Sequence, residues 1–318
     1  MKKIGILYGQ ENSFPPAFVE RVNQKTGGNG IVAEPVRIDK VIQGESCGYD
    51  VVIDRISQDV PFYRGWLKNE ALTGCAVVNN PFWWSADEKF FNNALATKIG
   101  VAVPKTVLLP SHDLPNDTSN GSFRNLAYPL NWEAIFAYIG WPAYFKPFAG
   151  GGWKNVYKLN NPEEFFRAYG ETGQLVMMLQ EEVQFQMYFR CYSIDQRHVR
   201  VMNYEPRHPY HLRYQTDWQA PREILEKVEQ GVLALNQYLG YDLNTVEFAI
   251  RDGVPLAIDF CNPAPDAEVA SVGQANFDWV VEAVSEMAIR KAREHVPGRD
   301  NLSWGKFVQA GVNRRSLV

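Results

Sequence analysis

The predicted strands alternate with helices in the first part of this chain and form hairpins in the later part. This change restricts the possible folds more than any other feature of the sequence. In the first part, helices alternate with short apolar strands, at residues 3–8, 31–38, 51–56 and 75–81. In the later part, residues 186–206 and 245–263 are predicted to form hairpins that turn at Asp195-Gln196 and Asp252-Gly253. The chain is therefore predicted to be α/β, with a small parallel sheet followed by α+β structure.

The length and composition are compatible with several domains. A chain of 318 residues with 46% hydrophobic residues can bury a large core and divide into two or three domains. We expect a βα domain over residues 1–100 and two α+β subdomains over residues 101–178 and 179–318.

The charge and the cysteines restrict the partners and the location. A net charge of −4 without a basic run argues against nucleic acid and against acidic lipid surfaces as partners. Cys47, Cys75, Cys191 and Cys261 form no CxxC pair, which favours a reducing compartment. The N-terminus has two lysines and a short apolar stretch, too brief for a signal peptide or a membrane span. We expect a cytoplasmic protein without a membrane partner, and the sequence leaves a homodimer open.

Residues 143–157, AYFKPFAGGGWKNVY, place one lysine in an apolar strand ahead of three glycines. An isolated buried cation needs a partner, and an anionic ligand is the natural one for Lys146. Gly150, Gly151 and Gly152 allow backbone N–H groups to approach phosphate oxygens closely. The stretch therefore predicts a phosphate-binding loop, and a glycine-rich hairpin turn is the alternative.

Residues 81–100 carry the pattern of a helix, with Ser85 and Glu88 spaced as a capping box and Gly100 at the end. Lys89 lies in its first turn, where the helix dipole disfavours a cation unless an anion is near. This position also suggests a bound anion.

The second predicted hairpin contains a possible metal site. Glu247 lies on its first strand, and Asp259 and Asn262 lie on or just after its second strand. Carboxylate and amide oxygens suit Mg²⁺, a hard ion commonly shared with nucleotide phosphates. A structural acid at the end of a strand is the alternative interpretation.

Together these motifs resemble the ATP-grasp superfamily of carboxylate–amine ligases. The branch they resemble contains D-alanine–D-alanine ligase, glutathione synthetase and the ribosomal-protein glutamate ligase. The resemblance extends from the N-terminal βα domain to about Asp266. It implies an ATP-grasp architecture, in which two α+β subdomains clasp ATP after a small N-terminal domain.

The resemblance also implies roles for individual residues. Lys89 and Lys146 match the two lysines that contact ATP phosphates in the family, and the glycine loop follows the second. Glu181 matches the glutamate on the adenine side, with Glu182 as the alternative one residue on and Val183 beside it. Arg190 matches the arginine of the glutamate-ligase branch.

For the metal, the family pattern resembles Glu247, Asp259 and Asn262, with Mg²⁺ as the ion and Mn²⁺ as a substitute. Two departures from that pattern matter. The spacing from Asp259 to Asn262 is one residue longer than in the family, so strict alternation puts them on opposite faces unless a β-bulge realigns them. If Asp259 and Asn262 do lie on opposite faces, Asp266 is an alternative ligand. The arginine that dipeptide ligases carry two residues before the first metal ligand is Thr245 here.

The implied activity is an ADP-forming ligation through an acyl phosphate, with carboxylate and amine substrates that are small molecules or peptides. A thiol acceptor, a kinase on the same fold and an inactive nucleotide-binding protein are the alternatives. Residues 203–215 concentrate Arg207, His208, His211 and Arg213, so we expect Arg207 or Arg213 to replace the missing arginine. A solvated loop is the other interpretation of this segment.

Overall fold

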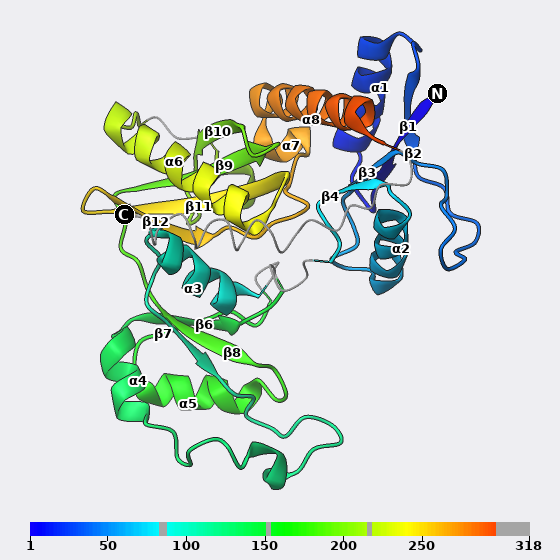
Figure 1. Cartoon of the computed structure of the whole chain (residues 1–318). Helices are drawn as coiled ribbons and strands as arrows, with labels where there is room; N and C mark the ends of the chain where they lie inside the picture. The colour runs from blue at the N-terminus through cyan, green and yellow to red at the C-terminus, as the bar shows by residue number, and fades with distance from the viewer. Residues whose placement is uncertain (83–87, 151–153, 215–217, 297–318) are drawn as a thin grey trace, which may run out of the picture. The chain divides into compact units, whose positions relative to one another are not determined.

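The computed structural model describes residues 1–82, 88–150, 154–214 and 218–296. The chain divides into two compact units, each of which is described by itself. Unit 1 comprises Met1–Trp84 and Met187–Val318, and unit 2 comprises Ser85–Gln186. Figure 1 shows the helices and strands with their labels.

The first sheet of unit 1 is parallel and has the strand order β2-β1-β3-β4. Its strands are β1 (Lys2–Leu7), β2 (Ile31–Pro35), β3 (Val51–Asp54) and β4 (Ala76–Val78). Helices α1 (Phe14–Thr26) and α8 (Gln274–Glu294) pack on one face, and α2 (Pro61–Leu72) packs on the other. Because both faces are covered, the strands are short apolar runs, as the sequence indicated.

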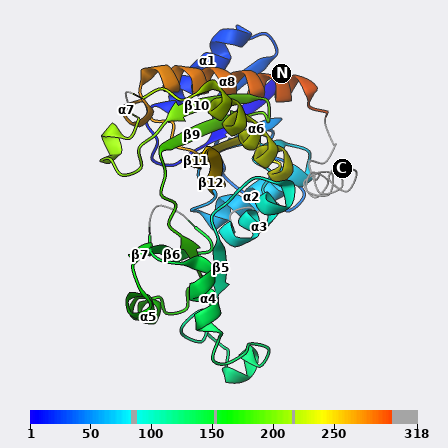
Figure 2. The same ribbon diagram turned by 90° about the vertical axis from the view of Figure 1, so that its left-hand side faces the viewer.

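Helix α8 joins the late part of the chain to the N-terminal sheet. It lies beside α1, as Figures 1 and 2 show, and Lys25 on α1 bonds to Glu286 on α8 at 2.8 Å. Phe18 of α1, Val284 of α8 and Tyr192 of the second sheet belong to one apolar core. The parallel sheet and the second sheet of unit 1 therefore fold around a shared core.

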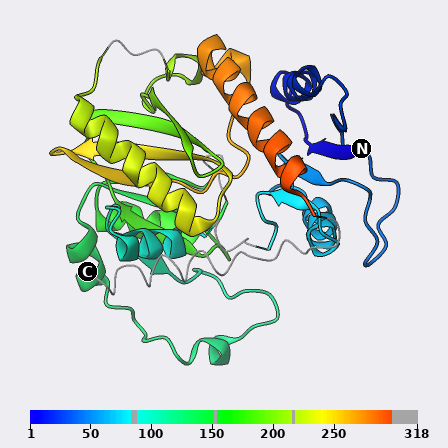
Figure 3. The same cartoon turned by 45° about the horizontal axis from the view of Figure 1, so that its top comes forward.

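The second sheet of unit 1 is antiparallel, with the order β10-β9-β11-β12. Its strands are β9 (Met187–Ile194), β10 (His198–Asn203), β11 (Leu243–Arg251) and β12 (Val254–Asp259). Helix α6 (Arg222–Leu239) lies across it, which Figure 3 shows in yellow. The residues at both predicted turns have positive φ, at 58° and 55° for Asp195 and Gln196 and 53° and 74° for Asp252 and Gly253. Such turns match the twist of a hairpin, so both hairpin predictions are confirmed.

Unit 2 contains an antiparallel sheet with the order β5-β8-β6-β7. Its strands are β5 (Thr106–Leu109), β6 (Ala143–Pro147), β7 (Tyr157–Leu159) and β8 (Met177–Glu181). Helices α4 (Trp132–Ile139) and α5 (Pro162–Glu171) share an apolar core with one face, while α3 (Lys89–Ile99) contacts β5. Asn161 caps α5, because its side chain accepts a hydrogen bond from the N–H of Glu164 at 2.9 Å.

The remaining described elements are short. They are η2 (Asn120–Phe123), η3 (Tyr210–Leu212) and α7 (Val269–Val272). The predicted domain boundary at residue 178 falls inside β8, which lies between β5 and β6 in the sheet. Helix α3 lies in unit 2, although we assigned residues 1–100 to the N-terminal domain. Among the residues that the structure describes, no helix is long and apolar enough to cross a membrane.

Candidate functional site

Lys146 lies on β6 with its side chain on one face of the unit 2 sheet. Its neighbours Ala143 and Phe145 are fully buried in the core that α4 and α5 share with the sheet. Strand alternation therefore directs Lys146 to the opposite face. Lys146 Nζ donates a hydrogen bond of 2.8 Å to Gln180 Oε1 on the adjacent strand β8. We predicted an anionic ligand for this lysine, and the protein side chain described as its partner is a neutral amide.

Lys89 is the first residue of α3, and a backbone hydrogen bond joins it to the chain just after β6. The N–H of Lys89 donates to the carbonyl oxygen of Phe148 at 2.6 Å. Gly150 follows with φ at 88°, a left-handed conformation that glycine adopts without strain. The helix N-cap is Glu88. Gly151 and Gly152 of the predicted phosphate loop lie outside the described residues, as does Ser85 of the capping box.

The predicted adenine-side residues follow one another at the end of β8. Glu181 Oε1 accepts a hydrogen bond from the N–H of Lys105 at 3.0 Å. Glu182 pairs with Lys158 of β7 at 2.5 Å, and Val183 is half-buried. Glu181 is thus held by the chain entering β5, which lies next to β8, and Glu182 by β7, which lies beyond β6 in the sheet.

Glu247 and Asp259 are brought opposite each other by a bulge in strand β12. The register pairs Phe248 with Ala257 but Glu247 with Asp259, which leaves Ile258 as an extra residue. The hydroxyl of Tyr188 donates to Glu247 Oε2 at 2.6 Å. Among the described residues, no three His, Cys, Asp or Glu side chains form a group suited to a metal. Two carboxylates suit Mg²⁺, which is commonly held by one or two carboxylates together with phosphates.

The loop after β12 positions Asn262 and Asp266 separately. The bulge lies before Asp259 and β12 ends there, so strand alternation does not decide where Asn262 points. Instead, the N–H of Asn262 donates to Asn244 Oδ1 at 2.8 Å. The carboxylate of Asp266 accepts hydrogen bonds from Tyr210, Ser271 and the N–H of Glu268. Asp266 therefore anchors η3 to α7.

Arg190 lies on β9 directly across from Glu247 on β11. Its Nε is 3.7 Å from Glu247 Oε1, and its guanidinium lies 5.7 Å from the centre of the Tyr204 ring. Burial alone would lower the pKa of Arg190, but Tyr214 and Glu247 raise it above its usual value. Burial, reinforced by Glu247, raises the pKa of Tyr188 well above its usual value. Arg190 is therefore charged and Tyr188 protonated near neutral pH.

The two arginines of the 203–215 segment have different partners. Arg207 forms a fork to Glu205, with Nε and NH2 bonds of 2.7 and 2.6 Å, and is largely exposed. Arg213 donates to the hydroxyl of Tyr204 at 3.2 Å. Because Tyr204 also lies against Arg190, Arg213 is the one of these two arginines that is joined to the Arg190 cluster. Residues 215–217 lie outside the described residues.

The sequence matches no protein-family model and no curated protein. In structure, the chain is similar to a D-alanine–D-alanine ligase from Bacillus anthracis complexed with ATP. That match has a TM-score of 0.62 and 14% identity, covering 92% of this chain and 98% of that one. A RimK domain ATP-grasp protein from Sphaerobacter thermophilus matches with a TM-score of 0.62 and 13% identity, covering 90% and 99% of the two chains.

The ATP-grasp ligase PsnB, complexed with a minimal precursor, matches with a TM-score of 0.64 and 16% identity, over 92% of this chain and 99% of that one. The chain has the ATP-grasp fold. The resemblance that the sequence indicated is thereby confirmed at the level of the fold, as is the α/β class.

Within this ATP-grasp fold, sequence reasoning missed the groups that hold the predicted site residues. Tyr188 bonds to Glu247, and Gln180 bonds to Lys146. Both lie on strands next to a predicted site residue. The sequence offered two signals for them: Tyr188 is a polar residue two positions before Arg190, and Gln180 is a polar residue just before Glu181.

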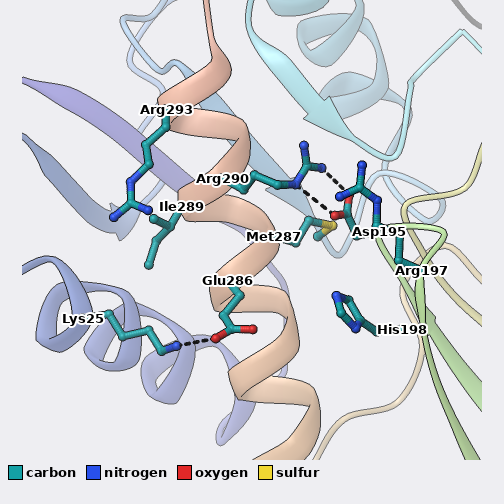
Figure 4. A pocket seen from close by; sticks show the side chains of 9 residues that line it. All are labelled: Lys25, Asp195, Arg197, His198, Glu286, Met287, Ile289, Arg290 and Arg293. Carbon is teal, nitrogen blue, oxygen red and sulfur yellow. Dashed lines mark hydrogen bonds and ion pairs between the residues drawn. The ribbon is translucent and has the colours of Figure 1, made fainter.

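A groove of about 450 Å³ lies on unit 1 between α1, α8 and the β9–β10 turn (Figure 4). It is lined by Lys25, Asp195, Arg197, His198, Glu286, Met287, Ile289, Arg290 and Arg293. Arg290 binds both carboxylate oxygens of Asp195, and Lys25 binds Glu286. Both acids of the groove are therefore paired with cations of the same groove, and the Arg290 pair holds the β9–β10 turn against α8.

Proposed function

We propose that this protein is an ATP- and Mg²⁺-dependent ligase that joins a carboxylate to an amine. The observation that carries the proposal is the pairing of Glu247 with Asp259 beside the buried Arg190, on an ATP-grasp fold. In the proposed reaction the γ-phosphate of ATP passes to the carboxylate and gives ADP and an acyl phosphate. The amine then attacks the acyl carbon, and phosphate leaves with its bonding electrons.

Unit 1 contributes the metal ligands in this proposal. Glu247, Asp259 and Asn262 would hold Mg²⁺, and the bound ion would offset the negative charge of the phosphates. Tyr188 supports this role, because its hydrogen bond fixes the orientation of the Glu247 carboxylate. Arg190 would stabilise charge that develops on the reacting groups, where a preorganised cation is effective.

Unit 2 contributes the nucleotide-binding residues. Lys89 and Lys146 would contact the phosphates, with Gly150, Gly151 and Gly152 supplying backbone N–H groups. Glu181, Glu182 and Val183 would contact the adenine side. The hydrogen bond from Lys89 to Phe148 supports this assignment, because it joins the start of α3 to the chain between β6 and the glycines.

The substrate class extends from small molecules to peptides. Similar structures include a D-Ala:D-Ser ligase and ligases complexed with precursor peptides, and all have this fold. Arg213 and Arg207 remain our proposed carboxylate-binding residues, and the contact of Arg213 with Tyr204 favours Arg213.

The experiment is a nucleotide-release screen of the purified full chain with Mg²⁺ and ATP, against amino-acid pairs, short peptides and polyamines. We expect ADP and phosphate whose release needs both a carboxylate and an amine. Phosphate transfer to a hydroxyl without an amine would identify a kinase, and AMP release would contradict the proposed chemistry. Absence of ATP binding would refute the proposal as a whole.

Three finer features belong to the same proposal. Mn²⁺ should replace Mg²⁺, since it accepts the same oxygen ligands. The four cysteines are free thiols, which supports a cytoplasmic location. The homodimer stays a prediction.

A further inference from the structure

Three side-chain oxygens meet in unit 1, where η3 contacts α7. The hydroxyls of Tyr210 and Ser271 each donate to Oδ2 of Asp266, and the two hydroxyl oxygens lie 2.9 Å apart. The other carboxylate oxygen, Oδ1, accepts a hydrogen bond from the N–H of Glu268 at 3.0 Å. The backbone thus holds one oxygen of the carboxylate, and the other oxygen is turned to the two hydroxyls.

The charge of Asp266 is not balanced by an ion pair with any lysine, arginine or histidine that the structure describes. Its hydrogen-bond partners are two hydroxyls and a backbone N–H, all of which are neutral. Asp266 is half-buried and Tyr210 is 55% exposed, so a ligand from solvent can reach the cluster. A partly buried carboxylate without a cation favours a positively charged ligand.

The cluster also has fewer hydrogens than contacts. An ionised carboxylate has no hydrogen to donate, and each hydroxyl has one. Burial, reinforced by Asp266, raises the pKa of Tyr210, so its hydroxyl keeps that hydrogen near neutral pH. When both hydroxyls donate to Asp266, the oxygens of Tyr210 and Ser271 face each other at 2.9 Å without a hydrogen between them. The cluster can therefore accept a further hydrogen-bond donor.

The segment that carries Asp266 is fixed beside the strand of Arg190. The main-chain oxygen of Asp266 accepts a hydrogen bond from the hydroxyl of Tyr192. Tyr192 is two residues after Arg190 on β9, so the two side chains lie on the same face, with about 7 Å between their positions along the strand. The preceding carbonyl, of Pro265, accepts from Arg55 at 2.6 Å. Both sheets of unit 1 thus hold this segment, because Arg55 directly follows β3.

We propose that Asp266, Tyr210 and Ser271 bind the ammonium group of the amine substrate. The inference rests on the proposed function and names the residues that would recognise its second substrate. An ammonium group has three N–H donors, which matches the three oxygens of the cluster. Most amines are ionised near neutral pH, because their pKa values are about 8 to 10. The ammonium charge would balance the carboxylate, which favours amines over neutral hydroxyl acceptors.

The experiment compares Asp266→Asn with wild type in two assays of the full chain with ATP and Mg²⁺. The first measures phosphate release against the concentration of the amine that the screen identifies. The second omits this amine and traps the acyl phosphate with hydroxylamine, which is uncharged at neutral pH. Its nitrogen attacks the acyl carbon, phosphate leaves with its bonding electrons, and a proton passes to solvent.

We expect the KM for the amine to rise about 10- to 100-fold in Asp266→Asn, the effect of losing a charge-assisted hydrogen bond. Hydroxamate formation should fall less than about threefold, because hydroxylamine brings no charge for Asp266 to bind. A purely structural role predicts instead a lower melting temperature and an equal loss in both assays. That result would overturn the binding role.

The two hydroxyls and a control complete the comparison. Tyr210→Phe and Ser271→Ala each remove one acceptor and should raise the KM for the amine about threefold. Asp278→Asn is the matched control, because Asp278 is an exposed carboxylate on α8 that accepts a hydrogen bond from the neutral side chain of Gln274 at 2.6 Å. Its KM for the amine should equal that of wild type.

Other outcomes would also overturn the assignment. A KM for the amine within about twofold of wild type in Asp266→Asn would do so. If that variant does not fold, an unchanged KM in both hydroxyl variants would have the same meaning. A raised Mg²⁺ requirement with an unchanged KM for the amine would make Asp266 a metal ligand instead. A wild-type protein that forms no hydroxamate and shows no amine-dependent phosphate release would overturn the proposed function and this inference with it.

Discussion

The two units each place a cation on a strand of an antiparallel sheet, but they surround it differently. In unit 1, Arg190 faces the carboxylate of Glu247 among tyrosines. In unit 2, Lys146 is held by the neutral amide of Gln180. Arg190 is largely buried, and the carboxylate of Glu247 offsets the cost of burying its charge. Lys146 is half-buried, and the side chain described as its hydrogen-bond partner is neutral.

The difference suggests different tasks for the two cations. A carboxylate beside Arg190 keeps part of its charge occupied and orients its planar donors, which suits stabilisation of charge that appears during a reaction. The amide of Gln180 adds no negative charge of its own beside Lys146, which suits a lysine proposed to bind an anion that is already present, such as a nucleotide phosphate. The predictions below test this distinction.

The largest effect is expected for Arg190→Lys, which keeps the charge but removes the forked donor geometry. If Arg190 stabilises developing charge, turnover should fall about 10²- to 10³-fold. ATP affinity should change little, because Lys146 carries that task. Phosphate release under saturating ATP measures turnover, and calorimetric titration measures ATP affinity. A variant that loses ATP affinity but keeps turnover would reverse the two roles.

Lys146→Ala should act on nucleotide binding. A charge-assisted hydrogen bond contributes roughly 1.5–3 kcal/mol, so ATP affinity should fall about 10- to 100-fold. Lys227→Ala is a suitable control, because Lys227 is an exposed lysine on α6 paired with Glu223. Unchanged ATP affinity in Lys146→Ala would remove this lysine from the site.

Tyr188→Phe tests whether Glu247 depends on its neighbour for orientation. Loss of the hydroxyl should raise the Mg²⁺ concentration needed for half-maximal activity about tenfold. This is the usual effect of removing a group that orients a metal ligand. Because burial and Glu247 raise the pKa of Tyr188, its phenol stays protonated through neutral pH. The ratio of variant to wild-type activity should therefore stay constant from pH 6 to about pH 9. A ratio that changes within this window would show that the phenol ionises there.

The smallest effects are expected in the 203–215 segment, where the two arginines serve as controls for each other. Arg213→Lys should reduce turnover about threefold, since it loses the hydrogen bond to Tyr204 beside Arg190. Arg207→Lys should reduce turnover less than Arg213→Lys does, because the fork of Arg207 is already bound to Glu205 at the surface. Turnover assays with the substrate found in the screen measure both. A larger loss in Arg207→Lys would mean that Arg207 leaves Glu205 to bind substrate.

Local signals in the sequence predicted much of the fold. Asp252-Gly253 marks a hairpin turn because both residues adopt positive φ there, and Gly100 marks the end of α3 because it adopts positive φ as the C-cap of that helix. These features depend on neighbours in the chain, and the structure has them at the predicted positions.

Features that depend on a second strand could not be predicted in the same way. The carboxylate pair of Glu247 and Asp259 depends on the register between β11 and β12, and the partner of Lys146 depends on β8 lying beside β6. Alternation in one strand predicts the face on which a side chain lies, but not what meets it there. Of the site residues, the sequence therefore supplied the charged groups and missed Gln180 and Tyr188.

Because β12 contains a bulge, the pairing of the two carboxylates tolerates the loss of Ile258 but not the loss of Asp259 beside it. Ile258 is surplus to the pairing, since Asp259 and Ala257 flank it and each already has its partner on β11. Loss of Ile258 would leave Asp259 opposite Glu247 in a regular ladder, whereas loss of Asp259 would remove a carboxylate and leave Ile258 opposite Glu247. Related chains could thus differ by one residue at this point and still keep the same two carboxylates face to face.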